Sequence, residues 1–302
     1  MESYVALMID LKKSRSYSQE DRNMIQDYIF NTILTLNRVF ERRMIRDVEF
    51  SAGDEVQGLF NSLEAAYLYF RFFNMLVYPV QVRAGIGVGE WSVQISQAST
   101  TAQDGSAYHN ARRAIEAVKE NSEYTLLIHS GGECDVFINA AIQSSIILTK
   151  NYSEYQNELM LLAELWYPID FQEIININKL PLLFPLLEKK VTLGYYTYYS
   201  NKKSKIIGKI AHDFQAAYQY MPTPIDALDE DTTFFVTRGK QRGMATALAD
   251  FLGISRQSVD KTLKSANIYE TRNATIVTLK LIDNYKRGRN DNLYTANLPY
   301  NR

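Results

Sequence analysis

Cysteine and histidine are scarce in this sequence. Its 302 residues contain one cysteine, Cys134, and three histidines. An internal disulfide is therefore excluded, and a zinc site built from cysteine and histidine ligands is not expected. No segment approaches the roughly 18 consecutive apolar residues that cross a bilayer, and the N-terminus lacks a basic stretch followed by an apolar one. These absences predict a cytoplasmic protein that has no membrane partner.

Proline and glycine are also few, with 7 and 14 residues, and 46% of the chain is hydrophobic. This composition argues against long disordered tracts, and the length leaves room for two or three domains. The net charge of -1 hides an asymmetry, because residues 201–302 carry 16 Lys and Arg against 10 Asp and Glu. The last third is therefore basic and the first 200 residues are acidic. Different partners for the two ends would explain this, as would a solvated surface alone.

Two carboxylates stand at the ends of apolar, strand-like runs. The run that starts at Tyr4 ends at Asp10, and the stretch from Val48 to Phe60 predicts a hairpin with Gly53-Asp54 as its turn. Hard cations such as Mg²⁺ prefer oxygen ligands, so acidic residues at the ends of neighbouring strands predict a divalent-metal site. Alternatively, Asp54 only closes the hairpin and Asp10 only caps the following segment. As strand-end carboxylates, both are expected to be exposed.

Hydrophobic periodicity predicts the order of the elements. Helices are expected at about 20–43, 61–75 and 106–121, and strands at 3–10, 48–60, 80–88 and 124–129. The order β-α-β-β-α-β-α-β is the split βαβ arrangement of a ferredoxin-like sheet with additions. The predicted fold class is therefore α+β, with an all-α region after the sheet.

Gly85, Gly87 and Gly89 alternate along one predicted strand. Successive side chains of a strand point to opposite faces, so the three glycines leave one face bare. A bare face lets another group approach closely. The sequence leaves open whether that group is a helix or a phosphate-bearing ligand.

The pattern becomes helical after Gly132. A long helix is expected from Asp135 to about Tyr167, with a break near Asn151. One interpretation of residues 153–190 is a degraded helix-turn-helix with helices at 158–166, 171–177 and 182–189, although Pro181 and Pro185 argue against it. The expected organisation is an α/β domain at 1–132, a helical middle region at 133–232, a helix-turn-helix domain at 233–285 and a flexible basic tail at 286–302.

The segment from Gly243 to Leu263 has the pattern of a helix-turn-helix. A helix of small residues is followed by Gly253 as the turn, Ser255 as the cap and a second amphipathic helix. Asp260 argues against DNA contact because it repels phosphate. A helical hairpin that is purely structural, or that binds protein, is the alternative. The exposed side of the second helix is predicted to present residues that can hydrogen-bond base edges and phosphates, namely Arg256, Gln257, Ser258, Lys261 and Lys264.

On these motifs the first half resembles class III nucleotide cyclases and, more distantly, GGDEF-type polymerase domains. The fuller resemblance is to the SatD family of bacterial proteins, over residues 1–130 and about 235–285. It rests on Asp10-Leu-Lys-Lys-Ser14-Arg15, Ala52-Gly-Asp-Glu-Val-Gln-Gly58, the Gly-Ile-Gly strand, Asp104-Gly-Ser-Ala-Tyr-His109-Asn-Ala-Arg112 and the helix-turn-helix.

The cyclase resemblance implies a site for a nucleoside triphosphate with Mg²⁺ or Mn²⁺. It puts the metal ions on Asp10 and Asp54 and a phosphate contact on Arg113. His109 stands where cyclases carry an asparagine, and Phe50 stands where they carry a purine-selecting lysine. The identity of the nucleotide is therefore not readable, and His109 could serve as a base-edge donor, a phosphate contact or a general base. Further contacts to the nucleotide are expected from Lys12, Ser14, Arg15, Gly53 and Arg83.

Three functions remain open at this point. In the first, a nucleotide and metal ligand of the front domain regulates a DNA-binding helix-turn-helix. In the second, the front domain is an active nucleotidyl cyclase or oligonucleotide synthase that the helical part regulates. The departures at His109 and Phe50 favour binding without turnover. In the third, both parts are protein-interaction modules with a dead site. Since class III cyclases work at dimer interfaces, the resemblance also makes a homodimer natural.

Overall fold

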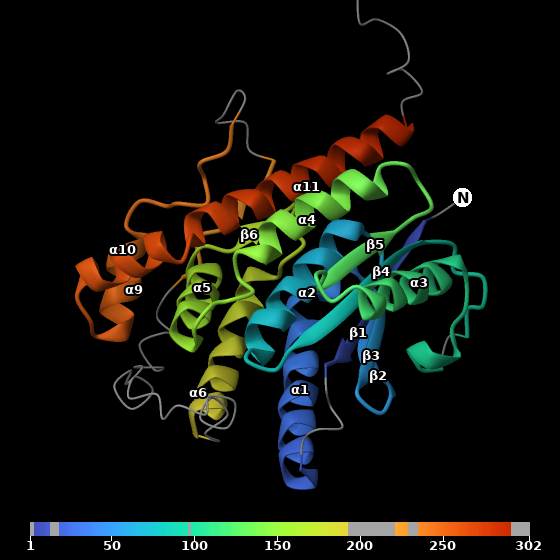
Figure 1. Ribbon diagram of the computed structural model, residues 1–302, viewed down its shortest axis with the longest axis horizontal. Helices are drawn as coiled ribbons and strands as arrows, with labels where there is room; N and C mark the ends of the chain where they lie inside the picture. Colours follow the sequence, from blue (N-terminus) through green and yellow to red (C-terminus); the bar gives the residue numbers. More distant parts are fainter. Residues whose placement is uncertain (1–2, 13–17, 96–97, 193–220, 229–234, 291–302) are drawn as a thin grey trace, which may run out of the picture.

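The computed structural model describes residues 3–12, 18–95, 98–192, 221–228 and 235–290. The architecture is α+β. A sheet lies at one side of the molecule, and helices from the second half of the chain lie against it and extend away from it (Figure 1).

The sheet has five strands in the spatial order β2-β3-β1-β4-β5. The central strand β1 is antiparallel to both of its neighbours, β2 is antiparallel to β3, and β5 runs parallel to β4. The predicted order of elements is confirmed here, as is the turn at Gly53-Asp54, where Gly53 has a φ of 63°. The strands are β1 (Tyr4–Leu11), β2 (Met44–Ala52), β3 (Glu55–Phe60), β4 (Val82–Gly89) and β5 (Leu126–His129).

Both faces of the sheet are covered. Helices α1 (Gln19–Val39) and α2 (Leu63–Val77) lie on one face, and α3 (Ser106–Glu120) lies on the other (Figure 1). The strand β1 shows the alternation, because Leu7 and Ile9 belong to the large core under α1 and α2, whereas Ala6 and Met8 belong to the small core under α3. Serine side chains at positions 18 and 62 cap α1 and α2.

The alternating glycines of β4 face α3. A Cβ at Gly85 would lie 2.4 Å from the carbonyl oxygen of Ala111, and a Cβ at Gly87 would lie 2.1 Å from that of Ala107. Both distances are far shorter than van der Waals contact, so only glycine allows α3 to pack this closely. Of the two alternatives that the sequence left open, the structure therefore supports the helix.

The middle region begins with the two predicted helices, α4 (Asp135–Ile147) and α5 (Glu154–Trp166), which are separated by the predicted break. The helix expected at 171–177 is wrong. The short strand β6 (Ile169–Asp170) pairs there with β7 (Ile225–Asp226), and the Asp170 carboxylate accepts a hydrogen bond of 3.0 Å from the backbone N–H of Ile175. This bond and the positive φ of Gln172 and Glu173 fix a turn instead of a helix. The remaining elements are the 3₁₀ helices η2 (Glu41–Arg43), η3 (Thr100–Ala102) and η4 (Ile177–Leu183) and the helix α6 (Phe184–Thr192).

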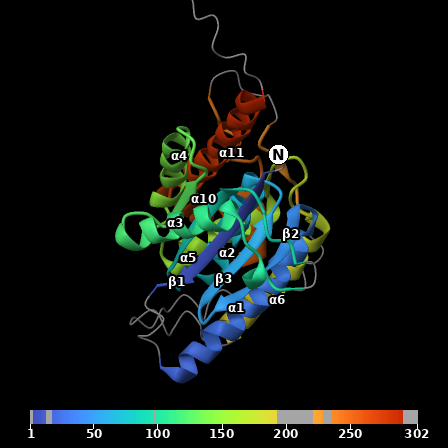
Figure 2. The same ribbon diagram turned by 90° about the vertical axis from the view of Figure 1, so that its right-hand side faces the viewer.

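Three helices end the described chain: α9 (Met244–Leu252), α10 (Arg256–Ser265) and α11 (Ile268–Asn290). With 23 residues, α11 is about 35 Å long. It lies beside α4 in both views, and α9 and α10 lie at the end of the molecule away from α3 (Figures 1 and 2). Residues 286–290 of the predicted tail belong to α11 instead, and residues 291–302 lie outside the described residues.

One cluster of buried apolar side chains runs through the sheet, the middle helices and the helices α9, α10 and α11. It includes Ile9 of β1, Trp166 of α5, Leu248 of α9 and Ile282 of α11. The predicted boundaries near residues 132 and 232 thus cross a continuous core, and the division into domains stays a prediction. Among the described residues, no helix is long and apolar enough to span a membrane.

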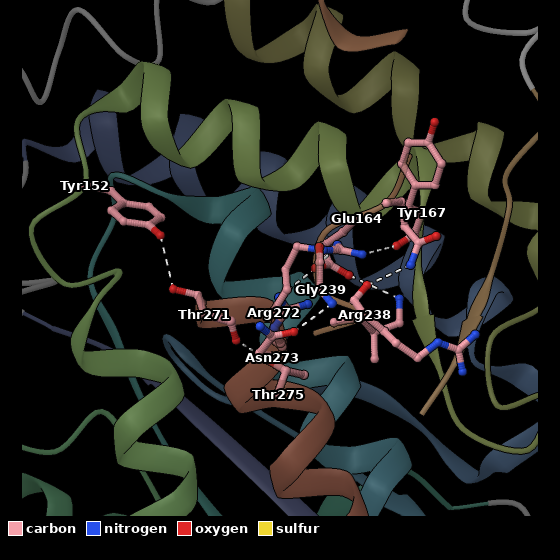
Figure 3. A network of polar contacts seen from close by, with 12 residues as sticks. Tyr152, Glu164, Tyr167, Arg238, Gly239, Thr271, Arg272, Asn273 and Thr275 are labelled. Atoms are coloured by element: carbon pink, nitrogen blue, oxygen red, sulfur yellow. Dashed lines mark hydrogen bonds and ion pairs between the residues drawn. The ribbon is translucent and has the colours of Figure 1, made fainter. Parts of the chain in front are cut away.

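Buried charges also join these parts (Figure 3). The Arg272 guanidinium of α11 forms an ion pair with Glu164 of α5 and donates hydrogen bonds to the carbonyl oxygens of Gly239 (2.8 Å) and Tyr167 (2.5 Å). Arg71 of α2 reaches the same carboxylate at 2.7 Å. The helix α11 is therefore joined to α5, and through Glu164 to α2, by buried, directional contacts.

Candidate functional site

Two carboxylates meet on the α3 face of the sheet. Asp10 of β1 and Glu55 of β3 are direct partners in the antiparallel register. Side chains of directly opposed residues lie on the same face, with Cβ atoms about 4.5–5.5 Å apart. Both residues are buried, with exposed fractions of 7% and 8%. The expectation that strand-end carboxylates are exposed is therefore wrong for Asp10, because α3 covers this face.

Each carboxylate is paired with cations. Arg83, the partner of Asp10 across β4, donates from Nε to the Asp10 carboxylate at 2.7 Å, and the ammonium of Lys119 lies 3.6 Å from it. Arg112 binds Glu55 through two hydrogen bonds of 2.6 and 2.7 Å. The hydrogen bonds to Glu55 raise the pKa of Arg112. Two carboxylates and three cations leave this cluster with an excess of positive charge.

Asp54 lies beside this cluster, at the turn between β2 and β3. It is half-buried, and Gly53 before it is exposed and accepts a hydrogen bond of 3.3 Å from Gln26 of α1. The carboxylate that faces Asp10 across the strands is thus that of Glu55, the residue after the predicted metal ligand. Ser51 donates a hydrogen bond of 3.2 Å to the Glu55 carboxylate, which further fixes its position.

The predicted nucleotide contacts lie in different places. Gly53 is in the turn between β2 and β3. Arg83 lies in the cluster, while Lys12 follows β1 and is half-buried. Burial lowers the pKa of Lys12, and the charges of Lys150 and Arg83 lower it further. Ser14 and Arg15 lie outside the described residues.

The two residues predicted to be catalytic lie on α3, at other positions than Arg112 and Lys119. His109 lies in the first turn of α3 and its Nε2 is 3.2 Å from the carboxylate of Asp104, with both side chains largely exposed. Lys119, which reaches Asp10, is ten residues further along the same helix, or about 15 Å. Arg113 is exposed, whereas its neighbour Arg112 turns toward the sheet and binds Glu55. The catalytic roles of His109 and Arg113 stay predictions.

A metal ion at this face would be held by the carboxylates of Asp10 and Glu55, with Asp54 at the side. Within the described ranges, no group of three or more His, Cys, Asp or Glu side chains is placed to hold a metal ion. The present partners of both carboxylates are guanidinium groups. Those same cations are the groups that bind phosphate oxygens. The cluster could therefore bind a metal ion together with a phosphate group only if its arginine and lysine side chains left the two carboxylates and bound the phosphate oxygens instead.

The segment predicted to be a helix-turn-helix forms two helices, α9 and α10, joined by a short turn. Gly253 ends α9 in the left-handed conformation, with a φ of 61°, and the Ser255 side chain caps α10 by accepting from the backbone N–H of Ser258 at 3.2 Å. Val259 and Leu263 are buried against the rest of the chain. These contacts fix which side of α10 faces solvent.

The solvent side of α10 carries the five residues proposed for DNA. Arg256, Gln257, Ser258, Lys261 and Lys264 are all exposed. Asp260 forms an i,i+4 ion pair of 2.6 Å with Lys264. Its hydrogen bond to Lys264 lowers the pKa of Asp260, with smaller contributions from nearby Lys240 and Arg256. Asp260, the residue that argues against DNA contact, is thus surrounded by basic side chains.

Comparison with protein families identifies one family, the SatD family, whose pattern matches residues 4–205. The chain belongs to the SatD family. The match includes the sheet with its Asp10–Glu55 cluster and continues through the middle helices, beyond residue 130, where the predicted resemblance in the first half ended. The helices α9, α10 and α11 of this SatD protein lie outside the matched residues. Comparison with curated proteins and with solved structures finds no match.

The charged partners of the site were not assigned from the sequence. Arg112 and Lys119 lie on α3, and Glu55 is the first residue of β3. Arg112 and Lys119 are seven residues apart on α3, so both face the end of the sheet that carries Asp10 and Glu55. That Asp10 and Glu55 lie side by side is known only from the register of β1 and β3. An acidic residue directly before an apolar strand was the available signal for Glu55.

Proposed function

We propose that this SatD protein is a cytoplasmic regulator that binds DNA through α10. The observation that carries the proposal is the row of exposed Arg256, Gln257, Ser258, Lys261 and Lys264 on one side of a capped second helix. Arginine, lysine, glutamine and serine bind phosphates and base edges in the major groove. The first turns of such a helix are the part that reaches base edges in helix-turn-helix proteins.

The surroundings of α10 support contact with an anionic partner. Lys240 and Arg242, just before α9, are exposed as well. A cluster of this kind attracts the phosphate backbone at long range, because phosphate contacts supply much of the affinity for DNA. A structural or protein-binding hairpin would not need several exposed cations on its outward side.

We further propose that the Asp10–Glu55 cluster binds a nucleoside triphosphate with Mg²⁺ or Mn²⁺. The observation in favour is the combination of two opposed carboxylates with three cations at one end of the sheet. On binding, Arg83, Arg112 and Lys119 would turn to the phosphates, and the freed carboxylates would hold the metal ion. The strand order β2-β3-β1-β4 supports the ferredoxin-like, cyclase-type part of this proposal.

The nucleotide would influence DNA binding through α11. This helix follows α10 directly, and its far end reaches the sheet domain, where Lys286 forms an ion pair with the buried Glu64 of α2. A shift of the sheet domain would therefore move the helix-turn-helix. A homodimer would suit both activities, since helix-turn-helix proteins commonly bind two half-sites.

An active nucleotidyl cyclase or oligonucleotide synthase is the second candidate. It needs a catalytic group near the metal ion, and His109 pairs with Asp104 instead. We therefore place nucleotide binding without turnover first.

The DNA proposal is tested by fluorescence anisotropy with labelled duplex DNA at low salt. We expect wild-type protein to bind, and the Arg256→Ala/Lys261→Ala variant to bind at least tenfold more weakly. The matched control is Arg42→Ala/Lys179→Ala, which removes the same charge from outside α9 and α10 and should bind as the wild type does. Absence of binding by the wild type, or equal binding by both double variants, would contradict the proposal.

A further inference from the structure

The buried charge network has one positive charge too many. It contains the guanidinium groups of Arg71 and Arg272 and the carboxylate of Glu164, with side-chain exposed fractions of 10%, 0% and 0%. In the described part of the chain, no second carboxylate pairs with either arginine. A buried charge without a partner is costly, so the excess charge requires an explanation.

Neutral Glu164 would only enlarge the imbalance, and it is not expected. Burial alone would raise the pKa of this carboxyl, but Arg272 and Arg71 outweigh burial and hold the pKa below its ordinary value. At neutral pH the three groups therefore carry a net charge of +1.

The excess charge is centred on Arg71. Its Nη2 binds Glu164, whereas its Nη1 is buried and has no hydrogen-bond partner among the described residues. Arg272, in contrast, uses Nε, Nη1 and Nη2 for Gly239, Glu164 and Tyr167. Nη1 of Arg71 is thus the nitrogen that remains to bind a counter-ion.

Arg71 lines a small cavity of about 30 Å³ between α2, α4, α5 and α11. About 10–15 Å³ suffices for one water molecule, so the cavity has room for one small ion or two waters. Its wall includes Asn74, Ser145, Thr149 and Thr271. No described Asp or Glu lines it.

A second cavity of about 90 Å³ adjoins the first and shares Asn74, Ile146 and Thr149 with it. It is lined by Lys12 and Lys150, and again by no described acidic residue. The two cavities together are therefore lined by three cations. The surroundings of Arg71 are therefore electropositive.

Asn74 is the second donor available to an anion. The hydroxyl of Ser145 donates to Ile142, and that of Thr149 donates to Ile146, so neither has a proton left for a ligand. The amide of Asn74 lies on the wall that the two cavities share. An anion at this place could accept from Nη1 of Arg71 and from Nδ2 of Asn74.

We propose that the smaller cavity binds a single small monovalent anion, such as chloride, between Arg71 and Asn74. The anion completes a neutral buried cluster that joins α2, α5 and α11. Sulfate and phosphate carry four oxygens around a central atom and are too large for this cavity. The site is separate from the Asp10–Glu55 cluster, which lies on the α3 face of the sheet.

The first test is the thermal stability of the full chain in sodium chloride and in sodium gluconate at one fixed ionic strength. Chloride should raise the Tm by about 2–4 °C at ten times its dissociation constant, and the Tm should go on rising with the logarithm of the chloride concentration. Asn74→Asp supplies the missing negative charge with an isosteric side chain, and Arg71→Met removes the excess positive charge. Both variants should lose the chloride dependence, whereas Arg42→Met, which removes an exposed arginine, should keep it.

The second test does not depend on any variant. Crystals of the wild-type protein grown in sodium bromide should show an anomalous bromide peak within hydrogen-bond distance of Nη1 of Arg71. A cavity that contains water only, together with a Tm that is the same in chloride and gluconate, would overturn the proposal. An equal chloride effect in wild type and Asn74→Asp would overturn it too.

Discussion

Asp10 and Glu55 face each other across β1 and β3, and each is bound by a different arginine, Arg83 and Arg112. The pairing explains how two carboxylates can lie side by side on a buried face without strong repulsion. It also places at one point the two kinds of group that a metal-bound triphosphate requires.

Replacing Asp10 tests the nucleotide site. Asp10→Asn keeps the shape of the side chain and removes one of the opposed charges, so we expect metal-dependent binding of nucleoside triphosphates to be lost. Thermal shift with ATP, GTP, CTP and UTP, each with Mg²⁺, Mn²⁺ or EDTA, measures this through the stabilisation that a ligand gives the folded state.

Two further variants identify the second carboxylate. If Glu55→Gln loses nucleotide binding and Asp54→Asn keeps it, the second metal ligand is Glu55. If Asp54→Asn loses binding and Glu55→Gln keeps it, the second ligand is Asp54. Because Asp10 is buried and paired, its removal should also lower stability, so the folded state is checked by circular dichroism. A folded Asp10→Asn variant with unchanged nucleotide binding would rule this site out.

Much of the sheet could be predicted from the sequence. The apolar runs, the Gly53-Asp54 turn and the alternating glycines specify local structure, and the order of the first eight elements followed from them. The partners of Asp10 could not be predicted in this way. They depend on the register of β1, β3 and β4 and on the direction of α3, which short-range patterns do not contain.

The structure of the middle region could not be predicted from local sequence patterns alone. Residues 171–177 have apolar spacing that suits a helix, but Asp170 binds the backbone of Ile175, and β6 pairs with residues more than fifty positions away at β7. A long-range pairing outweighed local preference. The buried network of Glu164, Arg71 and Arg272 was also not predicted, because its members come from three distant helices.

Glu164 is expected to be important for stability. Glu164→Gln leaves two buried guanidinium groups without their carboxylate, and loss of one partner of a buried pair costs about 3–5 kcal/mol. The free energy of unfolding, measured by urea denaturation, should fall by about this amount. Glu173→Gln is the matched control, because the Glu173 side chain is 88% exposed in its ion pair with Arg42 and should contribute little. Equal small effects in both variants would contradict the structural role of the network.

Lys190 gives the protein a specific dependence on pH. Its ammonium is buried and donates to the carbonyl oxygen of Leu76 at 2.6 Å, and burial lowers the pKa of Lys190 to about 7. Between this value and the ordinary pKa near 10.5, the unfolded chain binds more protons than the folded one. Stability should therefore rise with pH, by about 2 kcal/mol from pH 7 to pH 9.

The pH dependence is measured by urea denaturation across this range. Lys190→Met should remove the rise that the lysine causes, so the difference between the two profiles isolates its contribution. Profiles of the same slope in both proteins would mean that Lys190 stays charged in the folded state.

The salt dependence of DNA affinity tests the central claim most directly, because it counts the phosphate contacts made by α10. The logarithm of the binding constant should fall linearly with the logarithm of the salt concentration for the full chain. The Arg256→Ala/Lys261→Ala variant should have a slope smaller by about two, one for each lost phosphate contact. No affinity at low salt, or the same slope in the variant and the wild type, would contradict DNA binding through this helix.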